Sequence, residues 1–442
     1  NQRYAGGTMS FDIAGAATLG GTSYGAAGSL TGLVGSLATT GSGFVYSNGG
    51  ALTLTAGTGN LDLGSYAVTS PGALTLDAAG FVSSAGNGTV VSDNGAVTVR
   101  AGAGLNNAGT IAANAGGIAL QLGGTSANSG TIVAQGDLTL ADRSGGGSEA
   151  FTNAAGGRLL TAGSLSIKAA GLRNDGTVQA ARTIATADTL ANTGLFIAAT
   201  DPAADAAITV GSLTNAGTLQ ASRDLALHLA TSFANNGTAS AARGLTIDGG
   251  AVATNAAGAA ISGATVNAVL ASLDNAGTVV GGSALTLSAA GTLTNRATIG
   301  TNGGLVVTAG SLSNAATGTL QSGMGGSVSA AGALVNAGAI YLANASGSGT
   351  ISAGTLDNQA GGQIVSQADL ALRIGGATLV NEGNLLAQGS LAITGTGTAL
   401  AVTNAGGAFI QAGSAAGKSV TIGGTAVNLT TAANSVLTGN GI

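Results

Sequence analysis

The composition of this chain excludes a thick globular core and a nucleic-acid-binding surface. Of its 442 residues, 80 are Gly, only 3% are aromatic, none is Trp, and just 7% are charged. Large side chains are too scarce to fill a wide core, yet the 45% apolar content is too high for a flexible linker. The formal net charge of −5 provides no basic footprint for nucleic acid. We therefore expect an ordered but thin structure.

Cofactor sites and membrane spans are also not expected. The chain has no Cys, which excludes disulfides, thiolate metal sites and Cys nucleophiles. The most apolar stretch, around residues 251–273, is interrupted by Asn255 and Asn267, so no transmembrane helix is predicted. The first residues contain neither a basic nor an apolar leader segment, and we expect the sequence to be a piece of a longer chain.

Alternating apolar residues predict short strands along the chain, most clearly from residue 51 onward. Residues 1–50 are less regular and are assigned to the same solenoid as the rest. Residues 51–442 are predicted to form one continuous body, in which G-x-L-x-L segments recur, for example from Gly72, Gly95 and Gly136. Apolar residues alternate with polar ones in these segments, and this period of two indicates strands with one buried face.

A second motif, L-x-N-x-G-x-[LIV], makes the repeats clear over residues 105–410. Fifteen copies, some with two extra residues after the Asn, are spaced by about 21 residues on average. The Asn positions assigned to a common corner are Asn107, Asn174, Asn215, Asn235, Asn275, Asn295, Asn336 and Asn381. Further copies surround Asn128, Asn153, Asn192, Asn255, Asn314, Asn358 and Asn404.

A repeat of this length predicts an all-β parallel β-helix. About 21 residues at roughly 3.3 Å each make one three-sided coil, and the coils stack about 4.8 Å apart. A pair of antiparallel sandwiches is the alternative, but hairpins need paired Asn-Gly turns that a single-motif repeat does not predict. In the β-helix, one interior column is expected to contain Leu273, Leu293, Leu312, Leu334 and Leu356.

The recurring Asn is predicted to build a ladder at one corner of the coils. Asn tolerates turn conformations, and stacked amides can pair along the repeat axis. A line of carbohydrate-binding amides is the functional alternative. The two-residue insertion preserves the inside and outside alternation of the next strand, so the extra residues are expected to bulge outward.

These repeats resemble the shaft of the filamentous haemagglutinins, exoproteins exported by two-partner secretion. The resemblance rests on the L-x-N-x-G-x-[LIV] copies, the A-A-G-G corner variant and the G-x-L-x-L strands. It implies a right-handed β-helix, an outer-membrane transporter as a partner, and adhesion to a host or neighbouring-cell receptor or glycan. The N-P-N-L and N-P-N-G-I motifs of the family's secretion domain do not occur in this sequence.

Catalysis is the weaker hypothesis, although parallel β-helices also include polysaccharide lyases and glycosidases. Such enzymes need paired carboxylates or a calcium site with basic partners. The nearest clusters are Asp201 with Asp205, and Asp137 with Asp142 beside Arg143. His228 lies in the polar phase of a strand and is interpreted as an exposed residue. No catalytic residue is proposed.

One cationic site is a candidate for anion binding. Arg182, Arg223 and Arg243 each follow the Asn of their repeat by eight residues, and the last two belong to consecutive coils. Two guanidinium groups about 4.8 Å apart could bind a sulfated or carboxylated glycan. A solvated corner is the alternative interpretation. An ice-binding solenoid is a third hypothesis, but the T-x-T arrays that it needs occur only sporadically.

The sequence therefore predicts a structural shaft segment of a secreted bacterial surface adhesin. In this interpretation the segment projects a distal binding or toxic module and mediates cell adhesion, without a cofactor. A glycan-active β-helix enzyme remains the alternative.

Overall fold

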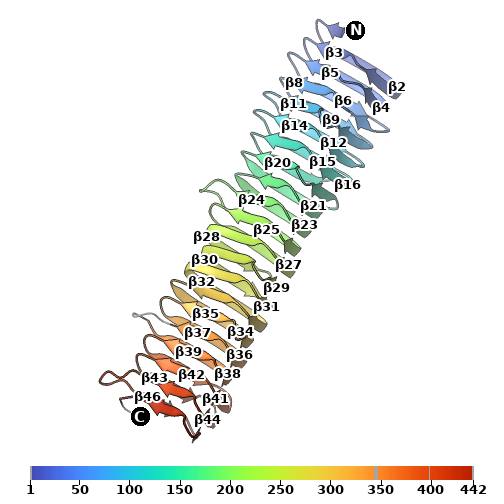
Figure 1. Cartoon of the computed structure of the whole chain (residues 1–442). Helices are drawn as coiled ribbons and strands as arrows, with labels where there is room; N and C mark the ends of the chain where they lie inside the picture. Colours follow the sequence, from blue (N-terminus) through green and yellow to red (C-terminus); the bar gives the residue numbers. More distant parts are fainter. Residues whose placement is uncertain (1, 343–346, 398, 441–442) are drawn as a thin grey trace. The chain divides into compact units, whose positions relative to one another are not determined.

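All regular secondary structure in the described part of the chain is β-strand. The computed structural model describes residues 2–342, 347–397 and 399–440. Residue contacts divide the chain into two compact units, Asn1–His228 and Leu229–Ile442. Within each unit, strands of successive coils lie side by side and pair in parallel (Figure 1). The predicted all-β parallel solenoid with coils of about 21 residues is confirmed.

The strands of the first unit range from 2 to 12 residues in length. They are β1 (Gln2–Ala5), β2 (Met9–Gly20), β3 (Ser23–Ala26), β4 (Leu30–Thr40), β5 (Phe44–Ser47), β6 (Leu52–Ala56), β7 (Leu61–Asp62), β8 (Ala67–Ser70), β9 (Leu74–Ala78), β10 (Phe81–Ser84), β11 (Thr89–Ser92), β12 (Val97–Ala101), β13 (Gly104–Asn107), β14 (Thr110–Ala113), β15 (Ile118–Leu122), β16 (Thr125–Asn128), β17 (Thr131–Ala134), β18 (Leu138–Asp142), β19 (Ala150–Asn153), β20 (Arg158–Thr161), β21 (Ser164–Asn174), β22 (Thr177–Gln179), β23 (Arg182–Asn192), β24 (Leu195–Ala199), β25 (Ala206–Asn215), β26 (Thr218–Ala221) and the start of β27 (Leu225–Asn235).

The second unit contains the end of β27 and the strands that follow it. They are β28 (Thr238–Asp248), β29 (Val252–Asn255), β30 (Ala260–Leu270), β31 (Ser272–Asn275), β32 (Thr278–Asn295), β33 (Thr298–Thr301), β34 (Gly304–Asn314), β35 (Thr319–Ser322), β36 (Gly326–Asn336), β37 (Ala339–Leu342), β38 (Gly349–Asn358), β39 (Gln363–Ser366), β40 (Leu370–Ile374), β41 (Thr378–Asn381), β42 (Asn384–Ala387), β43 (Leu391–Gly395), β44 (Leu400–Asn404), β45 (Phe409–Gln411), β46 (Val420–Gly423), β47 (Val427–Thr431) and β48 (Val436–Thr438).

Each coil contributes a strand to three parallel ladders. In the first unit β12, β13 and β14 belong to separate ladders, and their next partners are β15, β16 and β17. The less regular residues 1–50 follow the same arrangement, because β1, β3, β5 and β8 pair in parallel. From β21 onward one strand often runs through two faces, as in the 11-residue β21 and β23.

Alternation of side chains decides which face of each strand is buried. In β12, Val97, Val99 and Ala101 are buried, whereas Thr98 and Arg100 point outward. The interior is narrow, and its side chains are mostly Leu, Ile, Val and Ala. Small and branched residues fill such a space without strain, which accounts for the scarcity of aromatic residues.

One interior column of the second unit contains five leucines in register. Leu273 pairs with Leu293, and the register then continues through Leu312, Leu334 and Leu356. None of the five is more than 3% exposed. Burial of a Leu side chain contributes about 1.5–3 kcal/mol, so the column is a main source of cohesion between these coils.

The two-residue insertions after Asn153, Asn358 and Asn404 each form an exposed corner that contains a left-handed glycine. Gly156, Gly361 and Gly407 have φ values of 82°, 83° and 81°. All three are exposed, and open space surrounds the position where a Cβ would lie. Backbone conformation therefore selects Gly there, because other L residues are strained at this φ.

Replacing Leu334 by Asp should strongly destabilise the second unit. The change places a carboxylate in a dry, filled interior, and we expect a loss of several kcal/mol. Ala333→Asp is the matched control, because Ala333 is exposed on the same strand. Thermal unfolding followed by circular dichroism would measure both variants, and equal midpoints for Leu334→Asp and the wild type would contradict the interior column.

Candidate functional site

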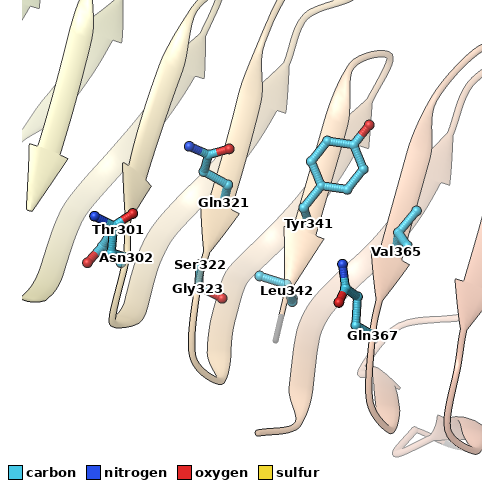
Figure 2. Close-up of a pocket in the computed structure, with 9 residues that line it drawn as sticks. All are labelled: Thr301, Asn302, Gln321, Ser322, Gly323, Tyr341, Leu342, Val365 and Gln367. Atoms are coloured by element: carbon cyan, nitrogen blue, oxygen red, sulfur yellow. The ribbon is translucent and has the colours of Figure 1, made fainter. Parts of the chain in front are cut away.

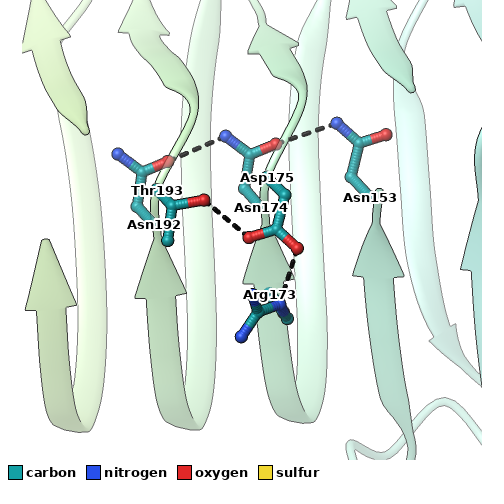
Figure 3. Close-up of polar contacts among 6 residues, drawn as sticks. All are labelled: Asn153, Arg173, Asn174, Asp175, Asn192 and Thr193. Atoms are coloured by element: carbon teal, nitrogen blue, oxygen red, sulfur yellow. Dashed lines mark hydrogen bonds and ion pairs between the residues drawn. The ribbon is translucent and has the colours of Figure 1, made fainter. Parts of the chain in front are cut away.

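The recurring asparagines of the first unit form a ladder of buried amides. Asn153 Nδ2 donates a hydrogen bond to Asn174 Oδ1 at 2.8 Å, and Asn174 Nδ2 donates to Asn192 Oδ1 at 2.8 Å (Figure 3). The sequence separation between bonded partners varies from 18 to 25 residues, yet the pairing is the same. Bonds of this type connect Asn107, Asn128, Asn153, Asn174, Asn192 and Asn215.

The second unit contains an equivalent ladder. Its amides are at most 1% exposed. The bonds connect Asn235, Asn255, Asn275, Asn295, Asn314, Asn336, Asn358, Asn381 and Asn404. These side chains are enclosed by the coils and are not available to an external ligand.

Backbone carbonyls determine the direction of the amides. Asn174 Nδ2 also donates to the Leu195 carbonyl at 3.1 Å, and Asn275 Nδ2 donates to the Thr298 carbonyl at 3.3 Å. A carbonyl oxygen only accepts, so the nitrogen must face the following coil and the amide oxygen the preceding one. Each coil therefore provides acceptors for the amide of the coil before it.

An exposed ion pair lies beside the ladder. Asp175 accepts a hydrogen bond from the Thr193 hydroxyl at 2.6 Å and another from Arg173 Nε at 2.6 Å (Figure 3). The Thr193 bond, followed by the Arg173 bond and charge, lowers the pKa of the Asp175 carboxyl below its ordinary value. Because Thr193 belongs to the next coil, this carboxylate bridges two coils on the outside.

Among the cationic candidates, Arg223 is half-buried and already has anionic and carbonyl partners. Arg223 Nε lies 3.2 Å from Asp205 Oδ1, and Arg223 Nη1 donates to the Ala203 carbonyl at 2.5 Å. Arg182 is the first residue of β23, and Arg243 lies within β28. Both are exposed. Arg223 belongs to the first unit and Arg243 to the second, so the stacked pair stays a prediction.

The carboxylates of the two candidate catalytic clusters have separate local partners. Asp201 Oδ1 accepts a hydrogen bond from the Ala203 amide at 2.8 Å, as in a turn. Asp137 Oδ1 accepts from the Ser164 amide at 2.8 Å. His228 is exposed on β27, as its polar phase predicts. Within residues 2–342, 347–397 and 399–440, no group of three His, Cys, Asp or Glu residues is arranged to bind a metal.

Asp142 organises a surface loop. Its Oδ1 accepts hydrogen bonds from the Ser144 amide at 2.8 Å and the Ser144 hydroxyl at 2.7 Å. The Ser144 hydroxyl bond, followed by the bonds from the Gly146 and Ser148 amides and the Ser148 hydroxyl, lowers the pKa of Asp142 to about 2. The neighbouring Arg143 lies 2.9 Å from Asp77 Oδ1 and also donates to the Ala78 carbonyl. This ion pair and this hydrogen bond thus connect the loop to an earlier coil.

An uncharged groove crosses β33, β35, β37 and β39. Gln321, Tyr341 and Val365 occupy equivalent outward positions on successive coils (Figure 2). The cavity has a volume of about 280 Å³, and the Tyr341 hydroxyl donates to Gln363 Oε1 at 3.0 Å. We call this cavity the amide groove, and it is lined by Thr301, Asn302, Gln321, Ser322, Gly323, Tyr341, Leu342, Val365 and Gln367.

A glycine makes space for one wall of the amide groove. Gly300 pairs with Gln321, and a Cβ on Gly300 would lie 2.6 Å from Gln321 Cγ. The repeat motifs of the sequence do not predict this groove. The alternation within each strand indicates that Gln321, Tyr341 and Val365 point outward. Because the length of the repeats varies, the sequence does not show that these three residues are neighbours on successive coils.

The fold and the internal ladder define a β-solenoid repeat protein. A haemagglutinin-repeat family model matches residues 195–269, 253–338 and 344–408. These matches confirm the predicted resemblance to the filamentous haemagglutinins within residues 195–408. No curated protein and no solved structure gives a significant match. In the described parts of the chain, no helix has the length and apolarity to cross a bilayer.

Replacing Asn275 by Leu should cost about 1–3 kcal/mol of stability in the second unit. The change removes the partner of Asn255 Nδ2 and leaves Asn295 Oδ1 without its donor. Asn267→Leu is the control, because Asn267 is exposed on β30. Chemical unfolding should show a lower midpoint for Asn275→Leu alone, and two variants with the same midpoint would speak against a stabilising ladder.

Acidification should remove the contribution of Asp175. Its pKa is lower in the folded chain than the value of about 3.9 in the unfolded chain, so its stabilisation is complete above about pH 4. That stabilisation is lost as the pH falls through the folded-state pKa. The thermal midpoint of the wild type should exceed that of Asp175→Asn at pH 7, and the difference should shrink toward pH 2.5. A constant difference would show that ionisation of Asp175 is irrelevant.

Proposed function

We propose that this chain is a shaft segment of a secreted, surface-displayed bacterial adhesin. The observation that supports the proposal is that residues matching haemagglutinin repeats form a solenoid, whose coils are joined by buried hydrogen bonds between asparagines. Filamentous haemagglutinins are structural adhesins and not enzymes. In this role the coils project a distal binding or toxic module and offer lateral surfaces to other cells.

The resemblance also supports a route of export. Members of the family leave the cell through an outer-membrane transporter of the two-partner system, which we propose as a partner of the protein that carries this segment. The absence of Cys is compatible with passage to the outside, because no disulfide has to form. Host or neighbouring-cell receptors and glycans are the proposed targets.

Charge distribution argues against acid–base catalysis as the main activity. Seven per cent of charged residues is a small supply for a cluster of carboxylates with perturbed pKa values. Asp142, Asp175 and Asp369 have lowered pKa values, and each has local hydrogen-bond or ion-pair partners. Binding through repeated surfaces therefore agrees better with the observations than turnover does.

Anionic glycans are the proposed ligands of Arg223 and Arg243. We expect weak binding of the chain to sulfated glycans, and we expect it to decrease with added salt because the contacts are ionic. The Arg223→Ala/Arg243→Ala double variant should lose this binding, whereas Arg373→Ala, which removes an exposed Arg on β40, should retain it. Salt-insensitive binding that survives the double substitution would reject this site.

The adhesin role itself is tested with the full chain on beads. Coated beads should attach to epithelial cells or erythrocytes more than beads coated with an unrelated protein, and incubation with polysaccharides should release no reducing ends. Release of reducing ends would favour the glycan-active enzyme. Beads that do not attach would restrict the segment to a passive spacer.

A further inference from the structure

The amide groove continues into a second depression on the same face of the second unit. Val365 lines both cavities, and the second has a volume of about 460 Å³. The outward positions pair in register from coil to coil, so they form one line parallel to the local stacking direction. We call this line the outer row, and it consists of Gln321, Tyr341, Val365, Leu386 and Gln411.

The outer row combines an aromatic ring with apolar and amide groups. Tyr341 is 40% exposed, Val365 and Leu386 are half-buried, and the row has a Gln at each end. Gln367 and Gln388 border the two depressions. All described residues that line the cavities are uncharged, so ionic ligands gain nothing from direct pairing here.

The length of the row suits an extended ligand. Four steps between coils at about 4.8 Å separate Gln321 from Gln411, which gives roughly 19 Å. Polar groups at intervals along a shallow, partly apolar floor favour a chain that has both C–H faces and hydroxyl groups. Aromatic rings present an apolar face to such ligands, whereas amides both donate and accept hydrogen bonds.

We propose that the outer row binds an extended, uncharged oligosaccharide along the stacking direction. One sugar ring packs on the exposed Tyr341 ring, and hydroxyl groups bond to the amides of Gln321 and Gln367. Gly300 keeps the Gln321 side chain close to the surface, because a larger residue would occupy its space. Apolar C–H groups of the next rings cover Val365 and Leu386.

A peptide fits this surface less well than a saccharide. Peptides commonly add to sheets by pairing with a free strand edge. Here β35, β37, β39 and β42 are each paired along the row, so the backbone groups that face neighbouring coils are occupied. A ligand on the row must be recognised by side chains alone, which suits hydroxyl-rich chains.

The inference rests on the proposed adhesin function and names a ligand class for one of its surfaces. The test uses the full chain and immobilised, unbranched tetramers of glucose, of N-acetylglucosamine and of galactose. Binding is measured by biolayer interferometry for the wild type, Tyr341→Ala and Gln321→Ala. Val306→Ala is the matched control, because Val306 is 45% exposed on β34 and lies outside both cavities.

At least one tetramer should bind the wild type, and Tyr341→Ala should weaken that binding about tenfold. Val306→Ala should not change it, and raising the salt concentration should have little effect because no ion pair is involved. Equal thermal midpoints would show that the variants remain folded.

Two results would overturn the inference. One is the absence of binding to all three tetramers at millimolar concentration, and the other is binding that survives both Tyr341→Ala and Gln321→Ala. Neither result decides the adhesin function, because attachment of coated beads to cells is measured separately and can depend on other surfaces.

Discussion

Parallel hydrogen bonding between successive coils is the constraint on which the rest of this structure depends. It places paired strand residues beside their equivalents in the next coil. Each side chain must therefore be compatible with the equivalent side chains directly above and below it. Leu273 and Leu293 meet this condition through apolar contact, and Asn275 and Asn295 meet it by pairing their amides. Equal charges in adjacent coils would repel each other, which agrees with the low charge content.

The asparagine ladder solves a problem that the corner creates. A chain that turns inside a narrow coil leaves backbone carbonyls near the interior, and these need donors. Asn174 supplies one to Leu195 and still bonds to Asn192. Because all amides point the same way, each coil completes the hydrogen bonding of the coil before it. Stability is therefore shared between neighbours, as in other repeat proteins.

An interior that is fully committed to packing leaves only outward positions for function. A substitution at an outward position such as Tyr341 changes the surface without disturbing the column beneath it. Where outward residues of several coils match in chemistry, a binding surface can arise without a dedicated domain. We propose the outer row as such a surface, and Arg223 and Arg243 as residues that bind anions.

The spacing of residues along the chain predicts the strands, the parallel solenoid, the leucine column and the position of the asparagines, because a repeated motif indicates which residues stack. It did not determine the groove around Tyr341, the amide direction at Asn174 or the pairing of Arg223 with Asp205. Those features depend on the exact alignment of coils that differ in length by several residues. They become visible in the three-dimensional structure, since distances between side chains of different coils follow from register and not from spacing along the chain.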